Sequence, residues 1–157
     1  NVGLAVQAYL KRTLSDLEQM LDLNTLKIPV SYRLCKGIYV EPESIAFKKY
    51  EDINRHFLED LEFIFRNKIH VGIATHDKPL VEGAFNLIKK YNVPKELYEF
   101  QMLYGVTPKL RESILNAGHA MRVYVPFGKQ WFGYSTRRLK ENPEMATHII
   151  KALFYKG

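Results

Sequence analysis

The sequence predicts an α/β protein with a parallel sheet. Apolar runs of strand length alternate with helical patterns along the 157 residues, and this alternation is typical of parallel strands joined by crossover helices. No Gly-x-Gly-x-x-Gly sequence follows the first apolar run, which disfavours a dinucleotide-binding sheet. A (β/α)8 barrel of the TIM type is therefore the favoured architecture.

The chain is expected to form only part of such a barrel. Five strand–helix units can be counted, whereas a closed barrel needs eight. Five strands cannot close, so two sheet edges would stay open. We therefore expect 1–157 to be the carboxyl-terminal portion of the barrel domain, covering about its last five βα units. Asn1 stands without a Met at the start of an apolar strand, as expected if the amino-terminal strands are absent. Those strands, or another copy of the chain, are expected to cover the edges.

The elements of the first half follow from the spacing of apolar residues. An apolar run broken only by Gln7 predicts the first strand to be buried, and leucines at helical spacing predict the first helix. Ser15 and Glu18 in that helix have the spacing of a capping box. The expected elements, in order, are the strand Val2–Tyr9, the helix Thr13–Leu23, the strand Tyr32–Cys35 and the helix Lys48–Asn67.

The second half repeats the alternation. Thr107 and Pro108 have the residue types of an N-cap and a first helical position, and Gly118 is placed to end that helix. The expected elements, in order, are the strand Ile69–Thr75, the helix Pro79–Tyr91, the strand Leu97–Leu103, the helix from Thr107 to Gly118, the strand Met121–Val125 and the helices Phe132–Asn142 and Glu144–Phe154.

Composition excludes several classes of protein. Cys35 is the only cysteine, so an internal disulfide and a cysteine metal cluster are excluded, and no metal site is predicted. No apolar run approaches the roughly 18–20 residues of a membrane span. The net charge of +6 is spread along the helices, which favours a solvated surface over a nucleic-acid site. A reducing, cytoplasmic location fits this composition.

Polar residues stand where the predicted strands end. In a barrel the chemistry lies at the carboxyl ends of the strands. Each group also has a structural explanation: Arg33 can pair with Glu99 inside the barrel, and the Thr75-His76-Asp77 segment can cap the helix that follows. Their occurrence at five consecutive strand ends favours a site. The residues at these ends are Gln7, Arg33, Lys36, Gly37, Thr75, His76, Asp77, Gln101, Leu103 and Tyr124.

Two adjacent arginines follow the last strand. Arg137 and Arg138 lie on the predicted helix after the strand–loop segment that ends in Pro126-Phe127-Gly128. Each guanidinium is a planar fork that a carboxylate can accept in two places, so the pair suits a small carboxylic acid.

At these residues the chain resembles the proline dehydrogenase family of FAD-dependent barrel enzymes, and short monofunctional bacterial members most of all. The matching segments occur in family order across nearly the whole chain. They are Val6-Gln7-Ala8-Tyr9, Arg33-Leu34-Cys35-Lys36-Gly37-Ile38-Tyr39, Ala74-Thr75-His76-Asp77, Glu99-Phe100-Gln101-Met102-Leu103-Tyr104-Gly105, Arg122-Val123-Tyr124-Val125-Pro126-Phe127-Gly128 and Tyr134-x-x-Arg137-Arg138.

The resemblance implies oxidation of L-proline to Δ1-pyrroline-5-carboxylate, the first step of proline degradation to glutamate, by hydride transfer from C5 to flavin N5. It implies that Arg33 is catalytic beside N5, and that Arg137 and Arg138 clamp the proline carboxylate. Electrons would pass to a quinone, which implies transient contact with the inner face of the bacterial membrane. The implied FAD-binding residues are Gln7, Lys36, Gly37, Ile38, Thr75, His76 and Gln101, and the implied walls of the proline pocket are Leu103, Tyr124 and Tyr134.

Two other readings stay open. Lys36 at a strand end could be the nucleophile of a Schiff-base barrel aldolase. The chain could also be a non-catalytic barrel fragment. The family uses a lysine and an aspartate from earlier strands, and this chain has no positions for them.

Overall fold

The computed structural model of the chain describes residues 3–25, 29–125 and 127–129. Its strands are β1 (Gly3–Gln7), β2 (Ser31–Cys35), β3 (His70–Ala74), β4 (Tyr98–Leu103) and β5 (Met121–Tyr124). Its helices are α1 (Thr13–Gln19), α2 (Tyr50–Arg66), α3 (Lys78–Tyr91) and α4 (Pro108–Asn116), with 3₁₀ turns η1 (Leu21–Leu23) and η2 (Lys95–Leu97). The predicted strand–helix alternation is confirmed throughout this part of the chain.

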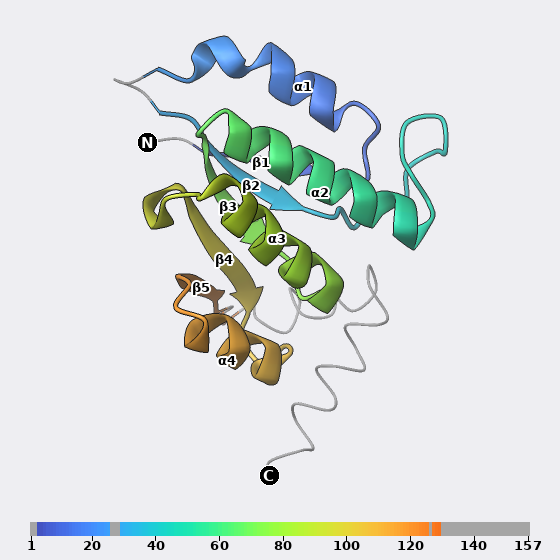
Figure 1. Cartoon of the computed structure of the whole chain (residues 1–157). Coiled ribbons are helices and arrows are strands. Elements are labelled where there is room, and N and C mark those ends of the chain that lie inside the picture. The colour runs from blue at the N-terminus through green and yellow to red at the C-terminus, as the bar shows by residue number, and fades with distance from the viewer. Residues whose placement is uncertain (1–2, 26–28, 126, 130–157) are drawn as a thin grey trace.

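The five strands form one sheet in the order β1-β2-β3-β4-β5, and every neighbouring pair is parallel. Sequential neighbours with helical crossovers are the arrangement of a (β/α) barrel wall. Among the described residues β1 and β5 are the two open edges of this sheet. Figure 1 shows α1 to α4 along the same side of the sheet.

The core lies between the sheet and these helices. Tyr32, Leu34 and Phe100 of the strands are at most 1 % exposed, and they belong to the same buried cluster as Leu61 of α2 and Leu80 of α3. Burying one large apolar side chain contributes roughly 1.5–3 kcal/mol. The burial of this one sheet face is therefore the main force that holds the helices in place.

The opposite face of the sheet is polar. Register pairs Arg33 of β2 with Gly72 of β3, and Gly72 with Glu99 of β4, so the three lie in one row. The next row pairs Gln101 with Arg122. We call this surface the polar face and define it by Arg33, Gly72, Glu99, Gln101 and Arg122. Because side chains alternate along a strand, burial of the even-numbered residues of β2 directs Arg33 away from the helices.

Three details differ from the predictions. The first strand is not buried, since Gly3, Leu4 and Ala5 are exposed on an edge strand with a neighbour on one side only among the described residues. The capping box is absent, because α1 already begins at Thr13 and Ser15 lies inside the helix. The predicted helix Thr13–Leu23 is α1 followed by the turn η1.

At α4 the predicted ends are nearly right. Thr107 is the N-cap residue, with φ of +41° and no side-chain capping bond, and Gly118 with φ of +80° follows the end of the helix. The predicted helices Phe132–Asn142 and Glu144–Phe154 lie outside the described residues. None of the helices in the described part of the chain combines the length and the apolar composition that crossing a bilayer requires.

One carboxyl group is buried on the helix side of the sheet. Asp60 of α2 is 1 % exposed, and neither of its carboxyl oxygens has a hydrogen-bond partner among the described residues. Burial raises the pKa of Asp60 to about 7, and the neighbouring charge of Glu59 adds to the shift. The neutral acid is the form that this site tolerates.

The pKa of Asp60 gives the fold a pH dependence that can be measured. Because the folded pKa lies above the unfolded value of about 3.9, stability is full below that value and falls by roughly 1.4 kcal/mol per pH unit up to about pH 7. Asp60→Asn should remove this slope and make the protein more stable than wild type at pH 8 but not at pH 4, as measured by urea unfolding. Glu51→Gln, at an exposed carboxylate in the first turn of the same helix, is the control and should keep the slope. An unchanged slope in Asp60→Asn would contradict the assignment.

Candidate active site

The polar face carries a chain of hydrogen bonds that includes Arg33. Arg33 Nε donates to Gln101 Oε1 at 2.9 Å, and Gln101 Nε2 donates to Glu99 Oε1 at 2.8 Å. Arg122 completes the chain from β5, with Nη2 donating to Glu99 Oε2 at 3.0 Å. The direct pair of Arg33 with Glu99 considered from the sequence is wrong, because Gln101 lies between them and Glu99 is occupied by Arg122.

Of the charged groups in this series of hydrogen bonds, Glu99 is paired with an opposite charge, and Arg33 is paired with no carboxylate of the described residues. Burial would raise the pKa of Glu99, but hydrogen bonds from Arg122 and Gln101 outweigh it and bring the pKa below its ordinary value. Glu99 is therefore an anion with a cation beside it. Arg33 is exposed, and it makes no ion pair with a carboxylate of the described residues. Its positive charge remains available to a ligand at this face.

A second cluster lies where β2 and β3 end. Lys36 Nζ is 2.7 Å from Asp77 Oδ2, the Tyr50 hydroxyl donates to the same oxygen at 2.7 Å, and Asn54 Nδ2 donates to it at 3.3 Å. Lys36 Nζ also lies 4.3 Å from the centre of the Tyr50 ring. The cluster ties the loop after β2 to α2 and to the start of α3.

Asp77 is an anion held by these donors. Burial would raise the pKa of Asp77, but hydrogen bonds from Lys36 and Tyr50 prevail and lower it. Asp77 does occupy the N-cap position of α3, yet its side chain makes no capping bond. Instead its backbone N–H donates to Oγ1 of the buried Thr75 at 3.1 Å. The segment Thr75-His76-Asp77 therefore supplies the N-cap residue of α3, as considered from the sequence, but no side-chain capping hydrogen bond.

The ends of β3 and β4 are joined by His76. The backbone N–H of Leu103 donates to His76 Nε2 at 2.9 Å, so this nitrogen carries no proton. Leu103 is paired in register with Tyr124 of β5, a residue that is 54 % exposed. Residues predicted for the cofactor and for the substrate pocket are thus in direct contact at the same end of the sheet.

Position 37 requires a glycine because a side chain packs closely against its backbone. Among the described residues, that side chain is Tyr9. The φ of Gly37 is +105°, and a Cβ there would lie 2.1 Å from the ring of Tyr9. Ile38 next to it is 38 % exposed. Gln7 ends β1, opposite Cys35 in the register, with its backbone oxygen accepting from Thr13 Oγ1 at 2.6 Å.

The structure therefore brings most of the predicted residues to one end of the sheet and adds others. Glu99, Arg122, Tyr50 and Asn54 were not assigned to the site from the sequence. Only Tyr50 and Asn54 offer a local signal, because residues four apart share one face of a helix. The predicted residues Tyr134, Arg137 and Arg138 lie outside the described residues.

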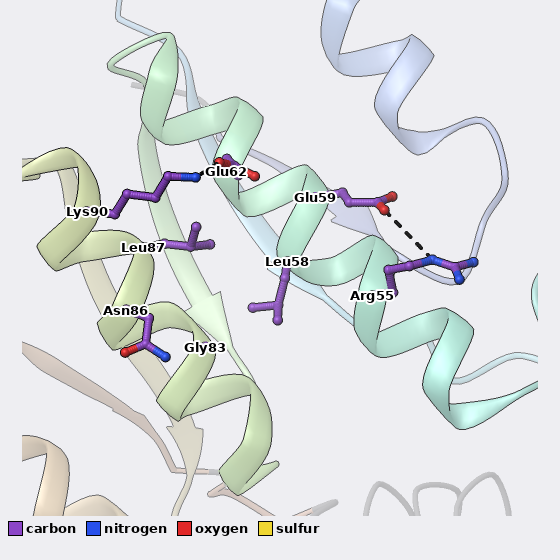
Figure 2. Close-up of a pocket in the computed structure, with 8 residues that line it drawn as sticks. All are labelled: Arg55, Leu58, Glu59, Glu62, Gly83, Asn86, Leu87 and Lys90. Carbon is purple, nitrogen blue, oxygen red and sulfur yellow. Dashed lines mark hydrogen bonds and ion pairs between the residues drawn. The ribbon is translucent and has the colours of Figure 1, made fainter.

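A groove on the outer surface does not coincide with this site. It lies between α2 and α3, has a volume of about 360 Å³ and is open to solvent (Figure 2). Leu58 and Leu87 contribute apolar surface, while Lys90 pairs with Glu62 at 2.7 Å on its margin. None of the predicted site residues lines it. Within the described part of the chain, no group of three or more His, Cys, Asp or Glu side chains is arranged to hold a metal ion.

The chemistry of the strand-end residues is that of a donor surface. Arg33 contributes positive charge, Lys36 contributes a cation paired with Asp77, and Gln7, Thr75 and Gln101 contribute amide and hydroxyl groups. Such a set suits a ligand rich in hydrogen-bond acceptors and negative charge.

Comparison with known proteins agrees with this geometry. The profile of the family "Proline dehydrogenase" matches residues 1–150. Proline dehydrogenase 1 of Bacillus subtilis (strain 168) is 34% identical over 155 residues, covering 99% of this chain and 50% of the relative. Proline dehydrogenase of Deinococcus radiodurans is 29% identical over 153 residues, covering 98% of this chain and 48% of the relative. The chain thus spans about half the length of these relatives.

A solved structure extends the similarity to the fold. Proline utilization A from Bdellovibrio bacteriovorus, inactivated by N-propargylglycine, superposes with a TM-score of 0.79 at 27% identity. The match covers 89% of this chain and 16% of that protein. The parallel sheet with its helices is therefore part of a TIM-type barrel, as predicted. The chain belongs to the proline dehydrogenase family.

Proposed function

We propose that the protein containing this chain oxidises L-proline to Δ1-pyrroline-5-carboxylate with FAD as hydride acceptor. The observation that carries this proposal, beside family membership, is Arg33. It is an exposed cation on the polar face, held through Nε by Gln101 and paired with no carboxylate of the described residues. A fixed positive charge of this kind stabilises electron density that develops on a neighbouring ligand.

The residues at the strand ends fit FAD by their chemistry. Flavin and its pyrophosphate present acceptors and negative charge, and the strand ends present donors and cations. We assign the cofactor to Gln7, Lys36, Gly37, Ile38, Thr75, His76 and Gln101. When bound, FAD supplies an acceptor for the hydride that leaves C5 of proline. Lys36 presents its ammonium group from a fixed position, with its charge balanced by Asp77, because Asp77 and Tyr50 hold it.

The substrate pocket is assigned to residues at the last strand and beyond it. Arg137 and Arg138 would clamp the proline carboxylate in two places, and Leu103, Tyr124 and Tyr134 would wall the ring. The clamp fixes the orientation of proline and lowers the entropic cost of bringing C5 to the acceptor. The amine of proline must lose its proton before the hydride leaves.

The remaining parts of the proposal concern the whole protein. We infer that 1–157 is the carboxyl-terminal portion of the barrel domain, and that further strands or another copy cover the edges at β1 and β5. Electrons would leave to a quinone, which requires contact with the membrane surface.

A Schiff-base aldolase is the weaker candidate. Its nucleophile would be Lys36, and a Schiff base needs a neutral, free amine. The ammonium group of Lys36 is instead 2.7 Å from the anionic Asp77 and lies over the Tyr50 ring. No observation on the described residues favours this function.

Arg33→Met tests the role of the cation. The substitution keeps the length of the side chain and removes its charge, so anaerobic flavin reduction by proline should slow about 100-fold. Proline binding should change far less, as measured by stopped-flow absorbance over a range of proline concentrations. Arg55→Met, on an exposed position of α2, is the control and should reduce at the wild-type rate. Unchanged reduction in Arg33→Met would remove Arg33 from the reaction.

Arg137→Met and Arg138→Met test the carboxylate clamp. Each removes a charge-assisted hydrogen bond worth about 1.5–3 kcal/mol, so KM for proline should rise roughly 10–100-fold. The flavin absorbance spectrum should stay nearly intact. Arg66→Met, at the exposed end of α2, serves as the matched control. Loss of flavin with proline affinity retained would show that these arginines hold the cofactor instead.

A further inference from the structure

Four side chains form a continuous polar chain across the open surface of the sheet. Arg122 of β5 binds Glu99 of β4, Glu99 accepts from Gln101, and Gln101 accepts from Arg33 of β2. The last of these bonds passes over β3. Arg33 stands at one end of this series of hydrogen bonds, and no carboxylate of the described residues compensates its charge. The other end is a neutralised ion pair.

Glu99 anchors the Gln101 amide at the end away from Arg33. A guanidinium can only donate, so Arg33 takes the Oε1 end of the amide, and the Nε2 end needs an acceptor elsewhere. A carboxylate can only accept, so the anionic Glu99 requires Nε2 on its side. Oε1 is then left facing Arg33, and it accepts from Nε at 2.9 Å. The guanidinium is thereby held by one edge.

Gly72 makes the connection possible. It stands on β3 between Arg33 and Glu99 in the register. A Cβ at Gly72 would lie 2.3 Å from Gln101 Nε2 and 2.7 Å from its Cδ. Any side chain larger than hydrogen would therefore displace Gln101, and with it the bond to Arg33.

We propose that Glu99 is a positioning residue for Arg33, acting through the Gln101 amide, and that Gly72 provides the space for this contact. This inference rests on the proposed function, in which the charge of Arg33 serves flavin reduction. Arg122 keeps Glu99 ionised without touching Arg33. This series of hydrogen bonds thus links β2 to β4, two strands that are not neighbours in the sheet.

Glu99→Met in the FAD-loaded protein is the first test. It leaves Arg33 present but removes the acceptor that anchors Gln101 at Nε2, so flavin reduction at saturating proline should slow about tenfold. The flavin reduction potential should become more negative in Glu99→Met/Arg122→Met, where the charge of Arg122 is removed together with that of its partner and Arg33 is held less firmly. The dissociation constant of proline should change less than about twofold. A merely structural role for Glu99 would move neither the potential nor the reduction rate.

Gly72→Ala is the second test, since it removes no polar group. It should slow reduction as Glu99→Met does and make the potential more negative, because it displaces Gln101 without changing any charge. In the Arg33→Met background Glu99→Met should cause no further slowing, because its effect passes through Arg33. Glu62→Met, on the outer surface, is the control. That carboxylate is also bound by a cation and a neutral donor, Lys90 and Tyr91, and its loss should leave reduction unchanged.

The outcomes separate this inference from the proposed function. If Arg33→Met slows reduction while Glu99→Met and Gly72→Ala reduce at the wild-type rate, the positioning role is overturned and the function stands. Additive effects of Glu99→Met and Arg33→Met would also overturn it. If Arg33→Met itself reduces normally, the role of Arg33 and the inference both fail.

Discussion

Burial of one face of a parallel sheet beneath helices is the constraint on which the rest of this structure depends. Tyr32 and Leu34 of β2 are buried, and the residue between them, Arg33, must therefore point to the opposite face. A slip of one residue in the register would exchange the two sets and bury a guanidinium. The apolar core thus decides the position of the polar groups without contacting them.

The charged residues of the site fall into two groups, carboxylates that are paired with cations and the arginine Arg33, which is paired with no carboxylate of the described residues. The two partly buried carboxylates, Asp77 and Glu99, are each held by a cation and by neutral donors. Both have pKa values below the ordinary range, so both are fully charged at neutral pH. Arg33 has the amide oxygen of Gln101 as a hydrogen-bond partner and forms no ion pair with a carboxylate of the described residues. An exposed charge of this kind costs little in stability and is free to act on a ligand.

Local patterns predicted the elements well, and contacts across the sheet poorly. The helix Lys48–Asn67 was found as Tyr50–Arg66, because its apolar spacing is long and regular. The Ser15 capping box failed, because the helix starts before it. The contact between Arg33 and Gln101 spans 68 positions and depends on a missing side chain at Gly72, which no local pattern reveals. Similarly, the pairing of Lys36 with Asp77 follows only from the order of the strands.

The central claim is that the residues at these strand ends bind FAD and that the bound flavin oxidises proline. The most direct measurement is the absorbance spectrum of the purified protein, recorded without oxygen before and after addition of L-proline. The account predicts a flavin spectrum that is bleached by proline and restored by a quinone. A protein that binds flavin without being bleached by proline, or that binds no flavin when FAD is supplied, would contradict it.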